Sequence, residues 1–150
     1  MRTTLGLCCA ALAAAGCVRE TSRTTARAAD EDERQSTLSE KAAREAVTRY
    51  FELLGEWNLP AAYDLLSVGE QHKVSYEEYR KACEADRESI TITAQKARVA
   101  YTGDGGVDPQ SRKPYVMVVV SIAGLPDLIF GAMPESGAWR VILTDARRIV

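Results

Sequence analysis

The sequence contains little cysteine, a single histidine and no apolar run long enough to span a membrane. Cys8 and Cys9 lie in an apolar N-terminal segment that Cys17 closes, which leaves only Cys83 in the remainder of the chain. A lone cysteine cannot form an internal disulfide, so we expect packing alone to stabilise the fold. One histidine and one free cysteine, without paired spacing, also argue against a closed zinc site, and we expect no metal.

Cys83 has two interpretations. It is either a reactive or dimer-forming thiol, or a small buried apolar residue on a helix, and the second is favoured by the frequency with which free cysteine is buried.

The sequence also lacks a large excess of charge of either sign. The chain has 19 basic and 21 acidic residues, for a net charge of −2. No basic stripe alternates with aromatic residues, so we expect no nucleic-acid partner. The glycine-rich run 103–106 leads to a turn at Pro109 rather than to a helix, which does not suit a phosphate loop, and we expect no cofactor.

The N-terminus begins with a short basic start followed by an apolar core, Leu5 to Gly16. Twelve helical residues reach only about 18 Å, short of a hydrocarbon layer roughly 30 Å thick, so the segment fits a secretory signal and not a permanent span. Its end, Leu-Ala-Ala-Ala-Gly-Cys at residues 12–17, resembles the lipobox of bacterial lipoproteins. That resemblance implies cleavage after Gly16, lipidation of Cys17 and an extracytoplasmic domain anchored to a membrane.

An alternative to lipidation is ordinary signal cleavage at the small residues Ala13 to Ala15, with simple secretion. If the host has two membranes, the absence of Asp after Cys17 favours the periplasmic face of the outer one, by resemblance to lipoprotein sorting. Loss of Arg2 with the signal would leave 18 basic and 21 acidic residues, a net charge of −3. In either case we expect the protein in the cell envelope or beyond it.

The chain divides into three parts: a signal peptide at 1–16, a lipidated cysteine with a disordered tether at 17–36, and one domain at 37–150. Residues 18–36 are rich in Arg, Thr, Ala, Glu and Asp and contain almost no large apolar residue. Such a segment buries too little surface to offset the entropy of ordering, which predicts disorder.

Three helices are expected in the first half of the domain. Thr37 and Glu40 have capping-box spacing, and apolar residues at helical spacing follow until Gly55. Asn58 is expected to cap a second helix that ends near residues 67–69. Ser75 and Glu78 form a second capping box, which predicts a third helix.

The second half of the domain has the period of strands. Apolar residues alternate over 90–94 and then over 97–101 with the opposite parity, which predicts one strand with a bulge near residues 95–96. A loop is expected at 102–109, followed by strands at 115–122, 128–133 and 138–144 with short turns. The fold class is therefore α+β: three N-terminal helices packed on a curved four-stranded antiparallel sheet.

Three stretches then carry a resemblance. Residues 50–67, Tyr-Phe-Glu-Leu-Leu-Gly-Glu-Trp-Asn and onward, with 75–79 and 137–142, resemble the cone-shaped domains of the nuclear transport factor two and ketosteroid isomerase (cystatin-like) superfamily. The resemblance covers roughly residues 38–146 and implies a cystatin-like cone. The fold hosts enzymes, binding proteins and assembly modules alike. Asp64 and His72 are the nearest candidates for a base, but both are most simply solvated, so we expect no catalytic residue.

Two groups of residues remain as candidate sites. A small apolar ligand would enter a cone cavity lined by aromatic residues: Tyr50, Trp57, Tyr63, Phe130 and Trp139. A homodimer would form through the second apolar face of the strand 115–122, which carries Tyr115, Met117 and Val119. The prediction is a lipid-anchored domain that binds or scaffolds without catalysis. The alternatives are an isomerase or dehydratase that uses the cavity, and a homodimeric assembly module.

Overall fold

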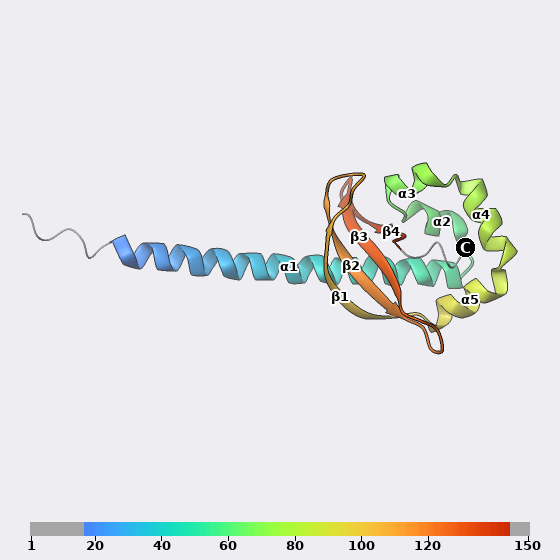
Figure 1. Ribbon diagram of the computed structural model, residues 1–150, viewed down its shortest axis with the longest axis horizontal. Helices are drawn as coiled ribbons and strands as arrows, with labels where there is room; N and C mark the ends of the chain where they lie inside the picture. The colour runs from blue at the N-terminus through green and yellow to red at the C-terminus, as the bar shows by residue number, and fades with distance from the viewer. Residues whose placement is uncertain (1–16, 145–150) are drawn as a thin grey trace, which may run out of the picture. The chain divides into compact units, whose positions relative to one another are not determined.

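The computed structural model describes residues 17–144, which form five helices and four strands (Figure 1). By its contacts the chain divides into two units, Met1–Ser36 and Thr37–Val150. The expected signal peptide, with its cleavage position Gly16, lies outside the described residues. The elements are α1 (Cys17–Gly55), α2 (Leu59–Asp64), α3 (Val68–Lys73), α4 (Tyr76–Ala85), α5 (Arg87–Lys96), β1 (Arg98–Val107), β2 (Pro114–Ser121), β3 (Leu128–Glu135) and β4 (Ala138–Ile142).

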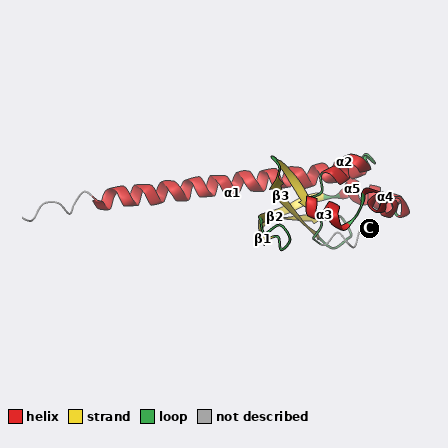
Figure 2. Cartoon of the chain, turned by 90° about the horizontal axis from the view of Figure 1, so that it is seen from above, coloured by secondary structure: helices red, strands yellow, loops and turns green. Residues whose placement is uncertain are grey.

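The four strands form one antiparallel sheet in the order β1-β2-β3-β4 (Figure 1). Figure 2 shows the strands in yellow. Short turns connect β2 to β3 and β3 to β4, and each contains a glycine with positive φ, Gly124 and Gly137. The expected α+β class and four-stranded antiparallel sheet are confirmed. The strands predicted at 115–122, 128–133 and 138–144 correspond to β2, β3 and β4.

One face of the sheet packs on the part of α1 that follows residue 42. The helix residues Ala43, Val47 and Phe51 are buried at the spacing that the sequence predicts. Opposite them, Val118 of β2 is paired in register with Phe130 of β3, and neither side chain is exposed. The core therefore lies between this stretch of α1 and the inner face of the sheet.

Two predicted helix starts are confirmed at the level of hydrogen bonds. The side chain of Asn58 accepts a hydrogen bond from the amide of Ala61 at 3.4 Å and caps α2. Ser75 and Glu78 form the full capping box at the start of α4, with each side chain bonded to the other residue's amide. Gly55 ends α1, as expected.

The first half of the expected strand over 90–101 is wrong, because residues 87–96 form helix α5 and β1 begins only at Arg98. Ile90, Thr93 and Ala94 are buried and Ala97 is partly buried, a spacing of three, four and seven residues that belongs to a helix face. Ile92, which a strand would place beside Ile90 and Ala94, is 44% exposed. The expected bulge at residues 95–96 is instead the end of α5.

Three further boundaries differ from expectation. Ser67 does not end the second helix region but caps an additional helix, α3, by accepting a hydrogen bond from the amide of Glu70. Strand β1 extends through the expected loop at 102–106, where the Asp104 side chain accepts a hydrogen bond from the amide of Gly106 beside a register irregularity. Helix α1 begins at Cys17 rather than Thr37, through a segment rich in the good helix formers Ala, Arg and Glu that we expected to be disordered.

Within residues 17–144, none of the helices is both long and apolar enough to cross a bilayer.

Candidate functional site

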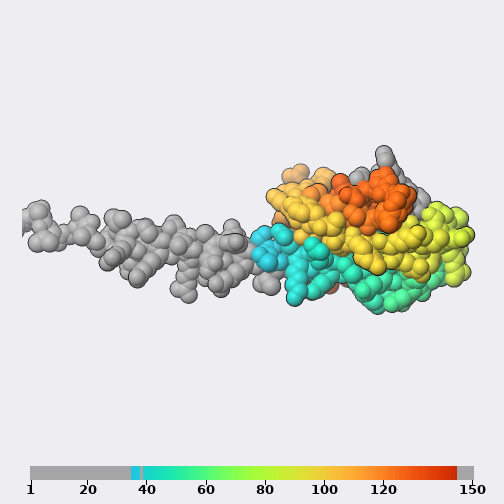
Figure 3. Space-filling model, turned by 90° about the horizontal axis from the view of Figure 1, so that it is seen from below, coloured from blue at the N-terminus to red at the C-terminus, as the bar shows by residue number. Residues whose placement is uncertain are grey.

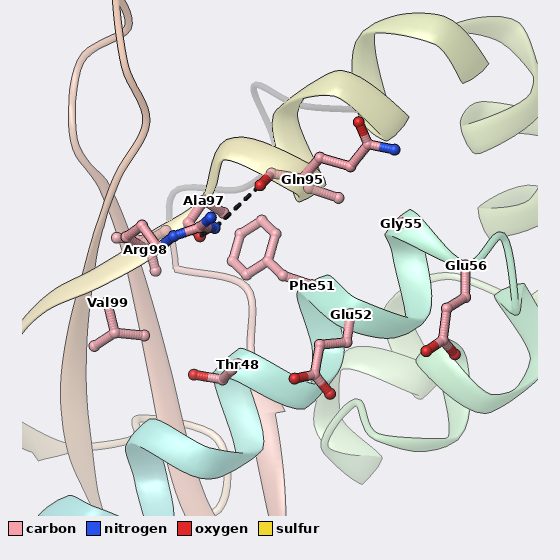
Figure 4. A pocket seen from close by; sticks show the side chains of 11 residues that line it. Thr48, Phe51, Glu52, Gly55, Glu56, Gln95, Ala97, Arg98 and Val99 are labelled. Carbon is pink, nitrogen blue, oxygen red and sulfur yellow. Dashed lines mark hydrogen bonds between the residues drawn. The ribbon is translucent and has the colours of Figure 1, made fainter.

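A pocket of about 480 Å³ lies between the end of α1, the end of α5 and the start of β1 (Figure 4). Figure 3 shows the face on which the surface of α1, in cyan, borders that of β1, in yellow to yellow-orange. The hydrogen bond from Arg44 Nη1 of α1 to the carbonyl of Val99 in β1, at 3.3 Å, helps to fix the distance between two of its walls. The volume lies within the range of small-molecule sites.

The floor of the pocket is apolar and continuous with the core. Phe51 of α1, Ala94 of α5 and Val120 of β2 are buried there, and Ala97 and Val99 are partly buried against the same core cluster. Gly55 adds no side chain, which leaves open the space between the two helix ends. The apolar part of a ligand bound in this pocket would contact this floor and be shielded from water.

One wall carries two carboxylates at the end of α1. Glu52 lies in the last turn of α1 and Glu56 directly follows the helix, where its amide donates a hydrogen bond to the carbonyl of Glu52 at 2.8 Å, and both side chains line the pocket. Arg49, one turn before Glu52, approaches both: its Nη1 lies 3.0 Å from Glu52 Oε2 and 3.7 Å from Glu56 Oε1. The two glutamate side chains remain 53% and 59% exposed, so the carboxylates stand at the rim.

The opposite wall carries one guanidinium group. Arg98, the first residue of β1, donates hydrogen bonds from Nη1 to the carbonyls of Gln95 at 3.0 Å and Ala97 at 2.6 Å (Figure 4). Carbonyls at the C-terminus of a helix lack intrahelical partners and carry partial negative charge. Arg98 therefore caps α5 and at the same time faces the pocket.

Two of the five residues expected to line a cone cavity belong instead to the filled core. Tyr50 is 4% exposed and Phe130 is not exposed, and their ring centroids lie 6.3 Å apart. The hydroxyl groups of Tyr50 and Tyr79 are 3.2 Å apart. Burial raises the pKa of both hydroxyls far above the usual range of tyrosine, so both stay protonated.

The other three expected cavity residues lie at separate places. Trp57 is half-buried under the guanidinium of Arg87, which lies 4.6 Å from its ring. Tyr63 donates a hydrogen bond to the carbonyl of Val74 at 2.8 Å, and Trp139 is partly buried against the core. None of the five lines the pocket at the ends of α1 and α5.

The pocket was not predicted, because residues 90–101 were expected to form a strand with a bulge near residues 95–96. Without a helix there, the small residues Gly55, Ala94 and Ala97 do not converge. The available signal was the helical spacing of Ile90, Ala94 and Ala97, followed directly by an arginine.

The three residues proposed for a dimer interface share one face of the sheet. Tyr115, Met117 and Val119 alternate along β2 with the core-facing valines, and each is half-buried. Tyr101 pairs with Val119 in register and is 57% exposed on the same face. Cys17, the expected lipidation site, is the first residue of α1.

The described residues contain no group of three or more His, Cys, Asp or Glu side chains placed to hold a metal ion. His72 is exposed at the end of α3, and Asp64 is exposed at the end of α2. Cys83 is buried.

Comparison with known proteins found no matching family model, no matching curated protein and no matching solved structure.

Proposed function

We propose that this protein is a lipid-anchored, extracytoplasmic domain that binds a small amphipathic molecule and does not catalyse a reaction. The observation that carries the binding proposal is the pocket between α1, α5 and β1, with an apolar floor and charged groups only at its walls. Small-molecule sites have this composition, since the floor supplies affinity and a few polar groups set orientation. The lipobox-like sequence that ends at Cys17 supports the anchor.

The position of the carboxylates supports binding rather than catalysis. An isomerase or dehydratase needs a carboxyl group desolvated at the base of its pocket and within reach of the substrate. Glu52 and Glu56 instead stand at the rim with more than half of each side chain exposed. The buried hydroxyls of Tyr50 and Tyr79 bond each other inside the packed core and do not line the pocket.

Occlusion of the pocket tests the binding proposal. Thr48 lies on the pocket wall and is exposed, so Thr48→Trp places an indole over the floor with little cost to the fold. We expect the variant to lose binding of phenylalkyl probes by about tenfold or more, measured by calorimetric titration of the full chain. Lys41→Trp, two turns earlier on α1 and outside the pocket, is the matched control. Equal binding by Thr48→Trp and Lys41→Trp would contradict the proposal.

A homodimeric assembly module is the second candidate. On the outer face of the sheet Tyr101 is 57% exposed, and the apolar residues Tyr115, Met117 and Val119 are only half-buried. The solvent-facing side of an antiparallel sheet is usually polar, so an apolar outer face suggests that a second copy covers it. This candidate predicts a dimer at micromolar concentration in sedimentation of the full chain, and a monomer after Met117→Glu. A wild-type monomer at that concentration would rule it out.

A further inference from the structure

We infer that Gly55 determines which apolar group the α1–α5–β1 pocket accepts: a slender one, such as an unbranched alkyl chain, which lies between Gly55 of α1 and Ala94 of α5. This inference rests on the proposed function, since it names the chemical class of the apolar part of the ligand. Three observations carry it: the surroundings of Gly55, the way in which α1 ends, and the width of the space beside the glycine.

The first observation is that nothing in the fold requires glycine at position 55. Gly55 is the last residue of α1 and has no positive φ, and a Cβ atom added to it would come no closer than 3.8 Å to its neighbours. The other glycines between residues 17 and 144 either have a positive φ or have a side chain closer than 3.0 Å to the position of an added Cβ atom. Glycine is also less stable in a helix than alanine. The backbone and the packing therefore leave Gly55 without a structural reason.

The second observation is that Trp57, and not Gly55, makes the turn that ends α1. Trp57 has a φ of 58°. Its amide donates a hydrogen bond to the carbonyl of Leu54 at 3.1 Å, and the amide of Asn58 donates one to the carbonyl of Leu53 at 2.8 Å. In this Schellman pattern the left-handed residue is usually glycine. The glycine thus stands two residues before the position at which the helix end would use it, and at a position that lines the pocket.

The third observation is the width of the space that Gly55 leaves open. A Cβ atom at position 55 would lie 3.8 Å from Ala94 Cβ and 3.9 Å from Gln95 Cγ, both on α5. These are contact distances between carbon atoms, so the space between the two helices is about one methyl group wide at this point. Gly55, Ala94 and Gln95 line the pocket together with Phe51 of the floor (Figure 4). An unbranched chain fits such a space, whereas a branched carbon is too wide.

Closing the space with a single methyl group tests this inference. Gly55→Ala should lower the affinity of the full chain for 4-phenylbutanol about fourfold, which is the effect of displacing one buried methylene group. The same variant should denature at a higher urea concentration than wild type, because alanine favours the helix. Ser89→Ala is the matched control, since it introduces alanine at an exposed position of α5 outside the pocket and should leave the affinity unchanged. Calorimetric titration measures the affinities.

Two further comparisons identify the width of the space as the cause. Gly55→Ala/Ala94→Gly moves the methyl group from one wall to the other, so it should recover most of the affinity that Gly55→Ala loses. The isomer 2-methyl-2-phenylpropanol carries the same phenyl and hydroxyl groups on a branched chain. The wild-type chain should bind this isomer more weakly than 4-phenylbutanol, and the difference should shrink in Gly55→Ala.

The proposed function and the role of Gly55 fail in different ways. If neither isomer binds the wild-type chain at millimolar concentration, the proposed pocket function is wrong. If Gly55→Ala binds 4-phenylbutanol as tightly as wild type, or is less stable than wild type, the pocket binds ligands but the inferred role of Gly55 is wrong. Equal binding of the two isomers by the wild-type chain, or no recovery in the double variant, would have the same meaning.

Discussion

At the scale of single residues, burial decides the chemistry of Cys83. The thiol is 1% exposed, and burial raises its pKa, so it is a protonated, packed group at neutral pH. We expect iodoacetamide to modify Cys83 roughly a hundredfold more slowly in the native protein than in denaturant, because labelling requires local opening. Mass spectrometry of the peptide that carries Cys83 measures both rates. Comparable rates would restore the interpretation of Cys83 as a reactive thiol.

The hydrogen bonds that Glu78 accepts make the stability of the folded protein depend on pH. Hydrogen bonds from the side chain and amide of Ser75 lower the pKa of Glu78 below its ordinary value. A carboxyl group with a lowered folded-state pKa stabilises the protein above its unfolded pKa, about 4.3, and loses that contribution as the pH falls through the folded value. Glu78→Gln should therefore be less stable than wild type near neutral pH and equally stable in acid.

Urea denaturation across this range of pH measures the effect, with Glu45→Gln as a control for the loss of one exposed carboxylate. Ser75→Ala, which removes the cap itself, should lower the free energy of unfolding by about 1 kcal/mol near neutral pH. A Glu78→Gln deficit that stays constant into acid would show that the ionised carboxylate is not what stabilises the start of α4.

At the scale of elements, the side chain of Tyr115 contacts glycines of both neighbouring strands on the outer face of the sheet. A Cβ atom added at Gly131 of β3 would lie 2.9 Å from the ring of Tyr115, and one added at Gly105 of β1 would overlap the same ring. The ring of Tyr115 in β2 therefore lies over a glycine in each neighbouring strand, where a Cβ atom would meet it. It links β1, β2 and β3 on the face away from the core.

A double-mutant cycle tests this arrangement. Gly105→Ala should lower the free energy of unfolding by about 1–2 kcal/mol in the wild-type background, because the ring must leave its position. In the background of Tyr115→Ala the same glycine substitution should cost much less, since the obstructing ring is gone. Thermal denaturation of the four proteins gives the coupling energy. Equal costs in both backgrounds would contradict the proposed contact.

The elements also show what the sequence could and could not predict. β2, β3, β4 and the caps at Asn58 and Ser75 were predictable, because β-branched runs and side-chain caps are local signals. Helix α5 was not recognised, because residues 90–101 fit two patterns: strand alternation with one slip of parity, and the helical spacing of Ile90, Ala94 and Ala97. The packing of Ile90 and Ala94 into the core selects the helical one.

The pocket could not be predicted from the sequence, because it requires the same helix α5. Its floor requires the end of α5 to meet the end of α1, a contact between residues about 40 positions apart that no local pattern encodes. The predicted cavity failed at Tyr50 and Phe130 for a related reason: aromatic residues on facing elements line a cavity or fill it depending on how closely those elements pack, and here they fill it.

At the scale of the whole molecule, the proposed membrane anchor of the binding domain depends on Cys17. We expect the wild-type chain in a bacterial host to incorporate an alkynyl fatty acid and to carry Cys17 as its first residue. Cys17→Ser should lose the label and keep residues 1–16, because the proposed lipid attachment and cleavage after Gly16 both depend on this cysteine. The mass of the purified chain measures both.

Cys8→Ser/Cys9→Ser is the matched control, since it removes two thiols from the same apolar segment without touching the lipobox-like end. It should keep the label and the cleavage after Gly16. A Cys17→Ser chain that is instead cleaved near Ala15 and released from the membrane would favour simple secretion. The domain would then meet its ligand in solution, and the membrane would have no part in presenting the pocket.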